Sequence, residues 1–268
     1  MIDYITNNEA ALRMSVFIGI LLLMMFVEAL LPRKARVQKR ARRWASNLLL
    51  VVIDSVVVRF LLPIVAVGVA SYAAAKGWGL LNLIALPDWL AIIAAIIILD
   101  MMIYWQHVLS HKWAPLWALH KVHHSDRDID VTTALRFHPA EIILSMLFKM
   151  ALVLALGAPV IAVIIFEIIL NGCAMFNHSN VRFPRRFDKV LRAVMVTPDM
   201  HRVHHSIIER ETNSNYGFST SLWDRIFRSY IPQPSQGHND MVIGLEEHQD
   251  ASPANLLWAL ILPFKRKS

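Results

Sequence analysis

The long apolar stretches of this chain limit its fold more than any other feature. Residues 14–31 (MSVFIGILLLMMFVEALL) are long enough to cross a bilayer as a helix. Comparable stretches follow at 47–75 and 89–106, and a Gly-Ala-Pro turn at 157–159 divides a fourth stretch, 142–176, into two short spans. The pattern predicts an all-α integral membrane helical bundle in which 142–176 forms a helical hairpin.

The composition agrees with a membrane protein. Hydrophobic residues make up 56% of the 268 residues and the mean hydropathy is +0.46, which is too apolar for a soluble enzyme of this size. Asp3 and Glu9 disrupt the basic start that a cleaved signal peptide needs, and a basic run stands where its cleavage site would be. We therefore expect the first stretch to remain as a span within one membrane domain that covers residues 1–268.

Lysine and arginine set the predicted orientation. Seven of them lie in RKARVQKRARR, residues 33–43, between the first two spans, and short basic loops stay in the cytoplasm. The N-terminus is then outside, and residues 107–138 and 177–268 form a cytoplasmic cap that lines the histidine site. Residues 255–264 are too short to span and predict an interfacial helix. The apolar spans beside the basic run argue against a nucleic-acid patch, so no nucleic-acid partner is expected.

The histidines point to a metal centre. Ten of the twelve fall between residues 107 and 205. Two blocks have the spacing HxxHH and a third has HxxxH, and on a helix residues i, i+3 and i+4 share one face. Neutral imidazole is the commonest protein ligand for first-row metals. The blocks predict a site with two nuclei, lined by His107, His111, His120, His123, His124, His201, His204 and His205.

Two further histidines lie between the blocks. His178 ends a polar stripe that contains Glu167, and it follows Asn177 directly. We expect His178 to be a ligand, Glu167 to support a ligand by hydrogen bonding, and Asn177 to belong to the site. His138 precedes a proline, and it is either a ligand or a residue that only begins a helix.

Asp100 lies on the same helical face as His107 and His111. A buried carboxylate on that face can accept a hydrogen bond from a metal-bound histidine, and we expect this role for Asp100. The other interpretation is a membrane aspartate that another helix satisfies. His238 and His248 stand in polar sequence and are expected at the solvated surface.

The residue types narrow the chemistry. A site of eight to ten histidines without an ExxH pattern is unlike a ferritin-like di-iron bundle, and it exceeds the three protein ligands of a zinc hydrolase. Two metals that are held mostly by imidazole and keep open positions suit the splitting of dioxygen. A metal transporter or store is the alternative, but a transporter would hold its ligands near the bilayer midplane on broken helices. The single cysteine, Cys173, excludes an intrachain disulfide framework and a Cys-ligated iron–sulfur cluster.

Five segments carry a resemblance to a known family: DMMIYWQHVLSH, LWALHKVHHS, RFHP, TPDMHRVHHS and TNSNYGFSTSLWDRIFRSY. Over residues 96–230 the chain resembles the fatty acid hydroxylase / sterol desaturase superfamily of integral membrane enzymes. The resemblance implies a non-haem di-iron centre with histidine ligands, which zinc can occupy in purified material. It also implies dioxygen-dependent hydroxylation or desaturation of a membrane lipid. The ligand positions that carry over are the eight block histidines, with His138 and His178 as additions.

Two positions depart from the family pattern. Val108 stands where the family usually has arginine, and Arg228-Ser229-Tyr230 stands where it often has Gly-Thr-Tyr. A carotenoid hydroxylase-like enzyme is an alternative with another apolar substrate. The first histidine block of such enzymes usually has one more residue between its histidines, which argues against this alternative.

The electrons for dioxygen splitting are expected from a separate protein. The chain has no GxGxxG motif and no other visible nicotinamide or flavin module. A ferredoxin or a small b-type cytochrome, each with its reductase, is the expected donor. Five cations on the predicted cytoplasmic side can dock such an acidic carrier or contact lipid head groups, and both interpretations stay open. They are Arg182, Arg185, Arg186, Lys189 and Arg192.

Overall fold

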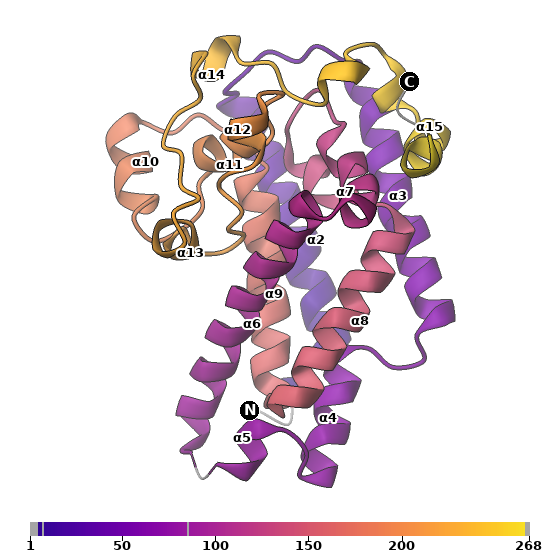
Figure 1. Ribbon diagram of the computed structural model, residues 1–268, viewed down its shortest axis with the longest axis vertical. Helices are drawn as coiled ribbons and strands as arrows, with labels where there is room; N and C mark the ends of the chain where they lie inside the picture. Colours follow the sequence, from indigo (N-terminus) through magenta and orange to yellow (C-terminus); the bar gives the residue numbers. More distant parts are fainter. Residues whose placement is uncertain (1–4, 7, 85, 266–268) are drawn as a thin grey trace.

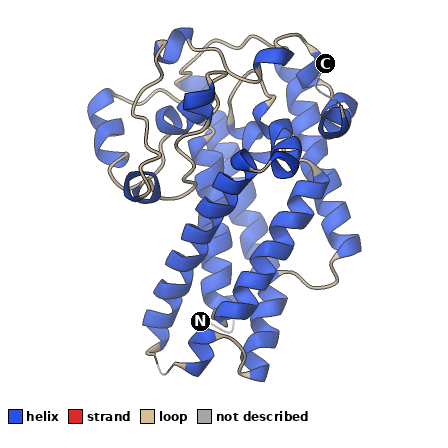
Figure 2. Ribbon diagram, in the orientation of Figure 1, coloured by secondary structure: helices blue, strands red, loops and turns tan. Residues whose placement is uncertain are grey.

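The structure is a computed structural model that describes residues 5–6, 8–84 and 86–265. Within these ranges it consists of helices and loops, with isolated β-bridges and no strand (Figure 2). Long apolar helices form a bundle, and shorter helices form a cap at one end of it (Figure 1). The prediction of an all-α bundle with membrane-spanning helices is confirmed.

Five helical segments are long and apolar enough to cross a membrane. They are α2 (Glu9–Leu30), α3 (Arg40–Leu61) continued by α4 (Ala66–Lys76), α6 (Asp88–Lys112), α8 (Pro139–Leu156) and α9 (Val160–Asn177). In Figure 1, α2, α6 and α9 run towards the cap, whereas α3, α4 and α8 run away from it. The basic run that follows α2 therefore lies at the cap end of the bundle.

The second crossing is broken. The gap between α3 and α4 contains Pro63, which lacks an N–H and disfavours helical backbone in the residue before it. α3 begins inside the basic run, at Arg40, because lysine and arginine are good helix formers and lead directly into the apolar stretch. The span expected over 47–75 is therefore two helices, and a short α5 (Leu80–Leu83) follows them.

The α8–α9 hairpin turns at Gly157, whose φ is 63°. A Cβ at this position would lie 2.5 Å from the carbonyl oxygen of Trp78. Gly79, with φ of 97°, faces it, and a Cβ on Gly79 would lie 2.1 Å from the nitrogen of Gly157. Only glycine fits this close approach of two backbones, so the turn is fixed by residues from two crossings.

The interior of the bundle lies between α4, α6, α8 and α9. Leu99 of α6, Val153 of α8 and Phe166 of α9 are buried there. The outward faces carry large exposed apolar side chains, among them Phe26 on α2 and Phe60 on α3. A helix that is apolar on both its inner and outer faces suits contact with lipid rather than water.

The cap consists of short helices and ordered loops above the bundle in Figure 1. Its helices are α7 (Ala114–His124), η1 (Val131–Leu135), α10 (Arg185–Leu191), α11 (Pro198–His204), α12 (Glu209–Thr212), α13 (Leu222–Ile226), α14 (Gly237–Asp240), η2 (Glu246–His248), η3 (Ser252–Ala254), α15 (Leu256–Ile261) and η4 (Leu262–Phe264). α15 and η4 cover the segment that was expected at the membrane interface. Ala259 and Leu262 are buried with Leu50 of α3 and Val122 of α7, whereas Leu257 stays exposed.

A buried arginine joins the cap to α3. The Nε of Arg43 lies 2.7 Å from Oδ1 of Asp126, and its Nη2 lies 2.5 Å from Oδ2 of Asp130. All three side chains are buried, so each charge depends on its partners for stabilisation. The loop after α7 is thereby fixed against the membrane helix.

A second buried arginine, Arg136, reaches several segments at once. It donates hydrogen bonds to Asn47 Oδ1 of α3 at 2.9 Å, to the Val122 carbonyl of α7 at 2.9 Å and to the Pro253 carbonyl of η3 at 2.7 Å. Because α7 carries three of the block histidines, this contact sets their position relative to the bundle.

Candidate metal centre

Nine of the ten predicted histidines come together in two groups. Within each group, one nitrogen from every ring lies within 4.8 Å of one nitrogen from every other ring. The five-histidine group consists of His107, His111, His120, His124 and His204. The four-histidine group consists of His123, His178, His201 and His205.

Each HxxHH block is divided between the two groups. In α7, His120 and His124 join the five-histidine group, and His123, at i+3, joins the other group. Residues i and i+4 diverge by about 40° around a helix, whereas i+3 diverges by about 60° in the opposite sense. The block in α11 is divided in the opposite way, because there only its i+3 member, His204, joins the five-histidine group. Each block therefore contributes two rings to one group and one ring to the other.

Three other features position the rings. α6 extends beyond the apolar stretch and carries His107 and His111, which are one helical turn apart. His178 is the C-cap residue of α9. α11 begins where the sequence indicated, since the Thr197 hydroxyl accepts a hydrogen bond from the Met200 N–H and a proline follows Thr197.

Hydrogen bonds fix the tautomers in the five-histidine group. Nδ1 of His107 donates to the Tyr216 carbonyl at 2.7 Å, and Nδ1 of His204 donates to the Ser214 carbonyl at 2.6 Å. A carbonyl oxygen can only accept, so in a neutral ring Nε2 carries a lone pair. The Nε2 atoms of His107 and His204 lie 3.1 Å apart, and His107 Nε2 also lies 3.1 Å from His120 Nε2. Lone pairs that face each other in this way require a cation between them.

The four-histidine group repeats this arrangement. Nδ1 of His178 donates to the Ala174 carbonyl at 2.7 Å, and Nδ1 of His123 donates to the Arg136 carbonyl at 3.3 Å. The His178 Nε2 atom then lies 3.0 Å from Nε2 of His123 and 3.0 Å from Nε2 of His201. Nitrogens that share one ion at about 2.1 Å can lie this far apart.

Other buried ring nitrogens have no hydrogen-bond partner among the described residues: Nε2 of His111, both nitrogens of His124, both nitrogens of His205, and Nδ1 of His201. An unpaired buried polar atom is costly unless something coordinates it. The residues present therefore fit two first-row metal ions, one in each group.

Burial keeps these rings neutral. It lowers the pKa of the cap histidines well below the usual range, and the neighbouring imidazoles lower the pKa further. This applies to His123, His124, His201, His204 and His205. Burial lowers the pKa of His178 to about 4. Neutral imidazole is the form that binds metals, so the site is ready for ligation at neutral pH.

His138 does not reach either group. Its Nδ1 accepts a hydrogen bond from the Ala140 N–H at 3.1 Å, and its Nε2 lies 3.2 Å from the Leu260 carbonyl. The ring caps the start of α8, which is the helix-starting role that the sequence left open. The expectation that His138 adds a ligand is corrected on this point.

Asp100 and Glu167 lie on the expected helical faces but too far along their helices. Asp100 is seven residues from His107, about 10 Å along the axis, and Glu167 is eleven residues from His178, about 16 Å. Asp100 Oδ2 accepts a hydrogen bond from Trp223 Nε1 at 2.7 Å. The contacts of Glu167 are Lys149 at 2.5 Å and Arg13 at 2.7 Å. Residues that share a helical face can still lie far apart along the helix axis. Neither carboxylate contacts a histidine of the two groups.

Asn177 lies beside His178, but its amide donates to the Phe218 carbonyl at 2.8 Å. This bond supports the loop that passes over the site, since the Phe218 ring lies 4.8 Å from the His107 ring. Asn177 is therefore close to the site, and its side chain contacts the loop.

The sequence did not indicate the carboxylate that contacts a ligand. Glu141, in the first turn of α8, places Oε1 2.6 Å from Nδ1 of His120. Its only sequence signal is an acidic residue three positions after His138 in RFHPAE. The expected surface position of His238 is also wrong, because its ring is buried with Nε2 3.7 Å from Asp199 Oδ2. His248 is half-buried against Trp258.

Membrane-spanning helices that hold two adjoining sets of buried imidazoles define an integral membrane protein with a histidine-rich metal centre. The family model for fatty acid hydroxylase matches residues 92–229, a range that contains every histidine of both groups. The chain belongs to this family. The resemblance drawn from the sequence is confirmed.

Curated relatives of the chain agree with this family assignment. The chain is 28% identical over 185 residues to ornithine lipid hydroxylase OlsE of Rhizobium tropici, covering 68% of this chain and 52% of that protein. It is 32% identical over 174 residues to alkylglycerol monooxygenase of Xenopus tropicalis, covering 62% and 36%, and 31% identical over 128 residues to the human enzyme, covering 47% and 27%. The chain thus spans about half or less of each of these relatives. No solved structure matches the chain significantly.

Proposed function

We propose that this chain is a membrane-bound non-haem di-iron oxygenase that hydroxylates or desaturates a lipid, using dioxygen and electrons from outside the chain. The observation that carries the proposal is the pair of buried imidazole groups in which Nε2 atoms face one another at 3.1 Å between His107 and His120 and at 3.0 Å between His123 and His178. The names of the relatives, a lipid hydroxylase and monooxygenases, support a lipid as the substrate.

The residues of the chain prepare the site for this chemistry. Two iron ions, when bound, would supply the oxidant for a C–H bond. The Tyr216 and Ser214 carbonyls hold the His107 and His204 rings so that Nε2 faces the group. The Glu141 carboxylate orients His120 through Nδ1 and increases the basicity of the ring. Other residues next to the two histidine groups would form the surroundings of the metals.

Aromatic side chains line the centre and exclude water. The Phe137 ring stacks on His123 with centroids 4.6 Å apart, Trp117 lies 5.0 Å from His111, and Phe218 lies 4.8 Å from His107. A dry, apolar lining suits a hydrocarbon substrate and limits the side reactions of a strong oxidant with water.

The position of the groups favours this function over metal transport. The ligands on membrane helices lie in the last two turns of α6 and at the end of α9, next to the cap. The broken crossing, α3 with α4, contributes no ligand to either group. A transporter would be expected to hold its ligands on such a broken helix near the bilayer midplane.

Lipid mass spectrometry tests the proposed reaction. Cells with the wild-type chain are compared with cells that carry His123→Ala with His204→Ala. We expect a lipid that has gained one oxygen or lost two hydrogens only with the wild type. Identical lipid profiles, with both proteins in the membrane fraction, would contradict the proposal.

We also propose that the metal centre faces the cytoplasm. The support is the basic run, which lies at the cap end of the bundle (Figure 1). On a Cys173→Ser background, an impermeant thiol reagent added outside should label Leu80→Cys, at the far end of the bundle, and should not label Glu247→Cys in the cap. Both positions are exposed. The opposite labelling pattern would reverse the orientation.

The electron donor is proposed to be a separate protein, such as a ferredoxin or a b-type cytochrome with its reductase. Hydroxylation of a C–H bond by dioxygen releases the second oxygen atom as water and consumes two further electrons. Purified protein with NADPH alone should be inactive and should become active when a carrier and its reductase are added. Steady turnover with NADPH alone would contradict the need for a second protein.

A further inference from the structure

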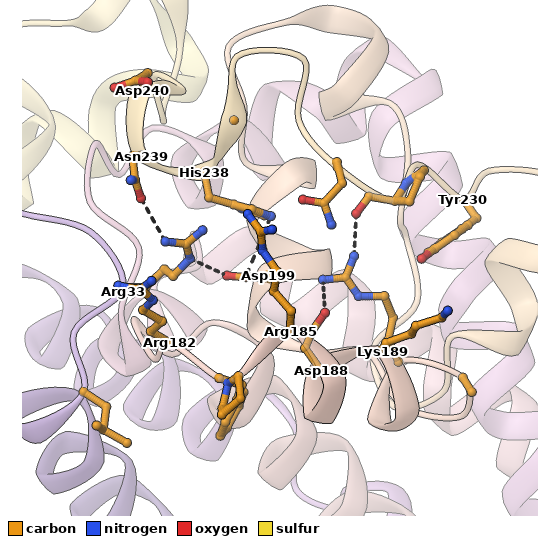
Figure 3. Close-up of a pocket in the computed structure, with 18 of the residues that line it drawn as sticks. Arg33, Arg182, Arg185, Asp188, Lys189, Asp199, Tyr230, His238, Asn239 and Asp240 are labelled. Atoms are coloured by element: carbon orange, nitrogen blue, oxygen red, sulfur yellow. Dashed lines mark hydrogen bonds and ion pairs between the residues drawn. The ribbon is translucent and has the colours of Figure 1, made fainter.

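A cavity of about 1500 Å³ opens on the side of the cap, between α10, α14 and the segment that follows α2 (Figure 3). Its lining contains six cations and three carboxylates, an excess of three positive charges. The cations are Arg33, Arg182, Arg185, Lys189, Arg192 and Arg225, and the carboxylates are Asp188, Asp199 and Asp240. None of these residues is a member of either histidine group.

The carboxylates leave several of the cations unneutralised. Asp188 Oδ2 lies 2.7 Å from Arg192 Nη2, and Asp199 Oδ1 lies 3.1 Å from Arg33 Nε. The exposed side chains of Arg182, Arg185 and Lys189 form no ion pair or hydrogen bond with any described residue. In Figure 3, Arg182 lies beside Arg33, Arg185 stands in the middle of the view and Lys189 lies towards Tyr230, so the three cations are spread across the cavity. They are available to a ligand that carries negative charge.

Exposed apolar side chains outside the cavity lie on the helix that carries several of its lining cations, and on the neighbouring α13. On α10, Phe187 is 52% exposed and Val190 is 74% exposed. On α13, Ile226 is 60% exposed, and α13 is joined to the residues after α10 by the Ser221 hydroxyl, which donates to the Arg192 carbonyl. In Figure 1, α10 and α13 lie to one side of the bundle near the cap ends of α6 and α9. Cations that alternate with exposed apolar residues are typical of a surface in the membrane interface.

We propose that this cavity binds the phosphate of an anionic phospholipid head group, with the acyl chains along the exposed apolar residues of α10 and α13. Guanidinium groups bind phosphate through paired hydrogen bonds, and the excess of positive charge selects a head group of net negative charge. The recessed site admits a head group, whereas the carboxylates of an acidic carrier protein project from a convex surface. This assignment does not depend on the metal centre.

Native mass spectrometry of the full chain in neutral detergent tests the proposal, with short-chain phosphatidylglycerol and short-chain phosphatidylcholine as probes. The wild type should bind phosphatidylglycerol preferentially. The variant Arg182→Gln/Arg185→Gln/Lys189→Gln should bind it at least about tenfold more weakly, because each cation near the surface contributes to the attraction. The matched control, Lys39→Gln/Arg42→Gln/Arg210→Gln, removes the same charge from exposed residues outside the cavity, at the cap end of the molecule, and should bind as the wild type does.

A second variant tests the exposed apolar side chains of α10. Phe187→Ser with Val190→Asn should weaken phosphatidylglycerol binding and leave all three free cations in place. Because all the substituted side chains are exposed, every variant should unfold at the same temperature as the wild type. Thermal unfolding is measured on the same samples as lipid binding.

Several outcomes would overturn the proposal. Equal loss of binding in the cavity variant and the control variant would mean attraction to general surface charge. Competition by glycerol phosphate or inorganic phosphate as effective as that of the lipid would mean a site for free phosphate. If the cavity variant keeps its lipid binding but loses electron transfer from an acidic carrier, the surface would be assigned to that carrier.

Discussion

The two histidine groups are built from the same residue type but are supported differently. The five-histidine group has a carboxylate partner, because Glu141 contacts Nδ1 of His120. In the four-histidine group, Nδ1 of His123 contacts the Arg136 carbonyl and Nδ1 of His178 contacts the Ala174 carbonyl. The first group therefore has one more ring and a charged acceptor. We expect it to hold its ion more tightly, while the ion in the second group keeps more open positions.

The largest expected effect comes from removing one ligand in each group. His123→Ala and His204→Ala should both abolish lipid oxidation, because the proposed reaction would need an ion in each group. Both proteins should still insert, since insertion depends on the apolar spans. Metal analysis should separate the groups, since His123→Ala leaves three rings and loses its ion, whereas His204→Ala leaves four rings and retains part of its metal. Wild-type turnover in either variant would remove that residue from the ligand set.

The second largest effect is expected from the carboxylate that contacts the five-histidine group. Glu141→Gln keeps a hydrogen-bond acceptor for His120 but removes the charge, so activity or metal affinity should fall about 10- to 100-fold. The control is Asp100→Asn, which changes a carboxylate that accepts from Trp223 and should have a smaller effect. Equal losses in the two variants would mean that the carboxylate beside His120 has no special role.

The pH dependence of the metal-free protein probes the four-histidine group. The pKa of His178 is lowered from its usual value to about 4 by burial, and the pKa values of His123, His201 and His205 are lowered as well. Between these values and about 6.5 the unfolded chain binds protons that the folded chain does not, so stability falls as the pH falls from 6.5 towards 4. The melting temperature of chelator-treated protein should follow this trend and stay level above pH 7. A constant melting temperature from pH 7 to pH 4 would contradict it.

The smallest effect should come from the histidine that lies outside both groups. His138→Ala removes the cap of α8, which should lower the free energy of unfolding by about 1 kcal/mol. Bound metal should not change, and activity should stay close to that of the wild type. Loss of a metal ion from this variant would restore His138 to the ligand set.

The helices and their breaks follow from the sequence. Apolar stretches of sufficient length predicted the crossings, and a Gly-Ala-Pro turn predicted the hairpin at Gly157. Pro63 is an equally local signal for the broken second crossing, but hydropathy alone does not indicate this break. Helical spacing also predicted that His107 and His111 lie on the same helix as Asp100, and α6 extends past the apolar stretch to Lys112.

The sequence by itself determined that histidines at helical spacing would share faces, because i, i+3 and i+4 neighbours are a property of the helix. Only the tertiary structure decided how those rings divide into two groups, and which residues orient them. The Tyr216 carbonyl, which fixes His107, is 109 residues away, and a backbone carbonyl has no signature in the sequence. The partners of Asp100, Glu167 and Glu141 and the burial of His238 likewise depend on how distant segments pack. Periodicity along one helix gives the direction of a side chain but not the atom that it meets.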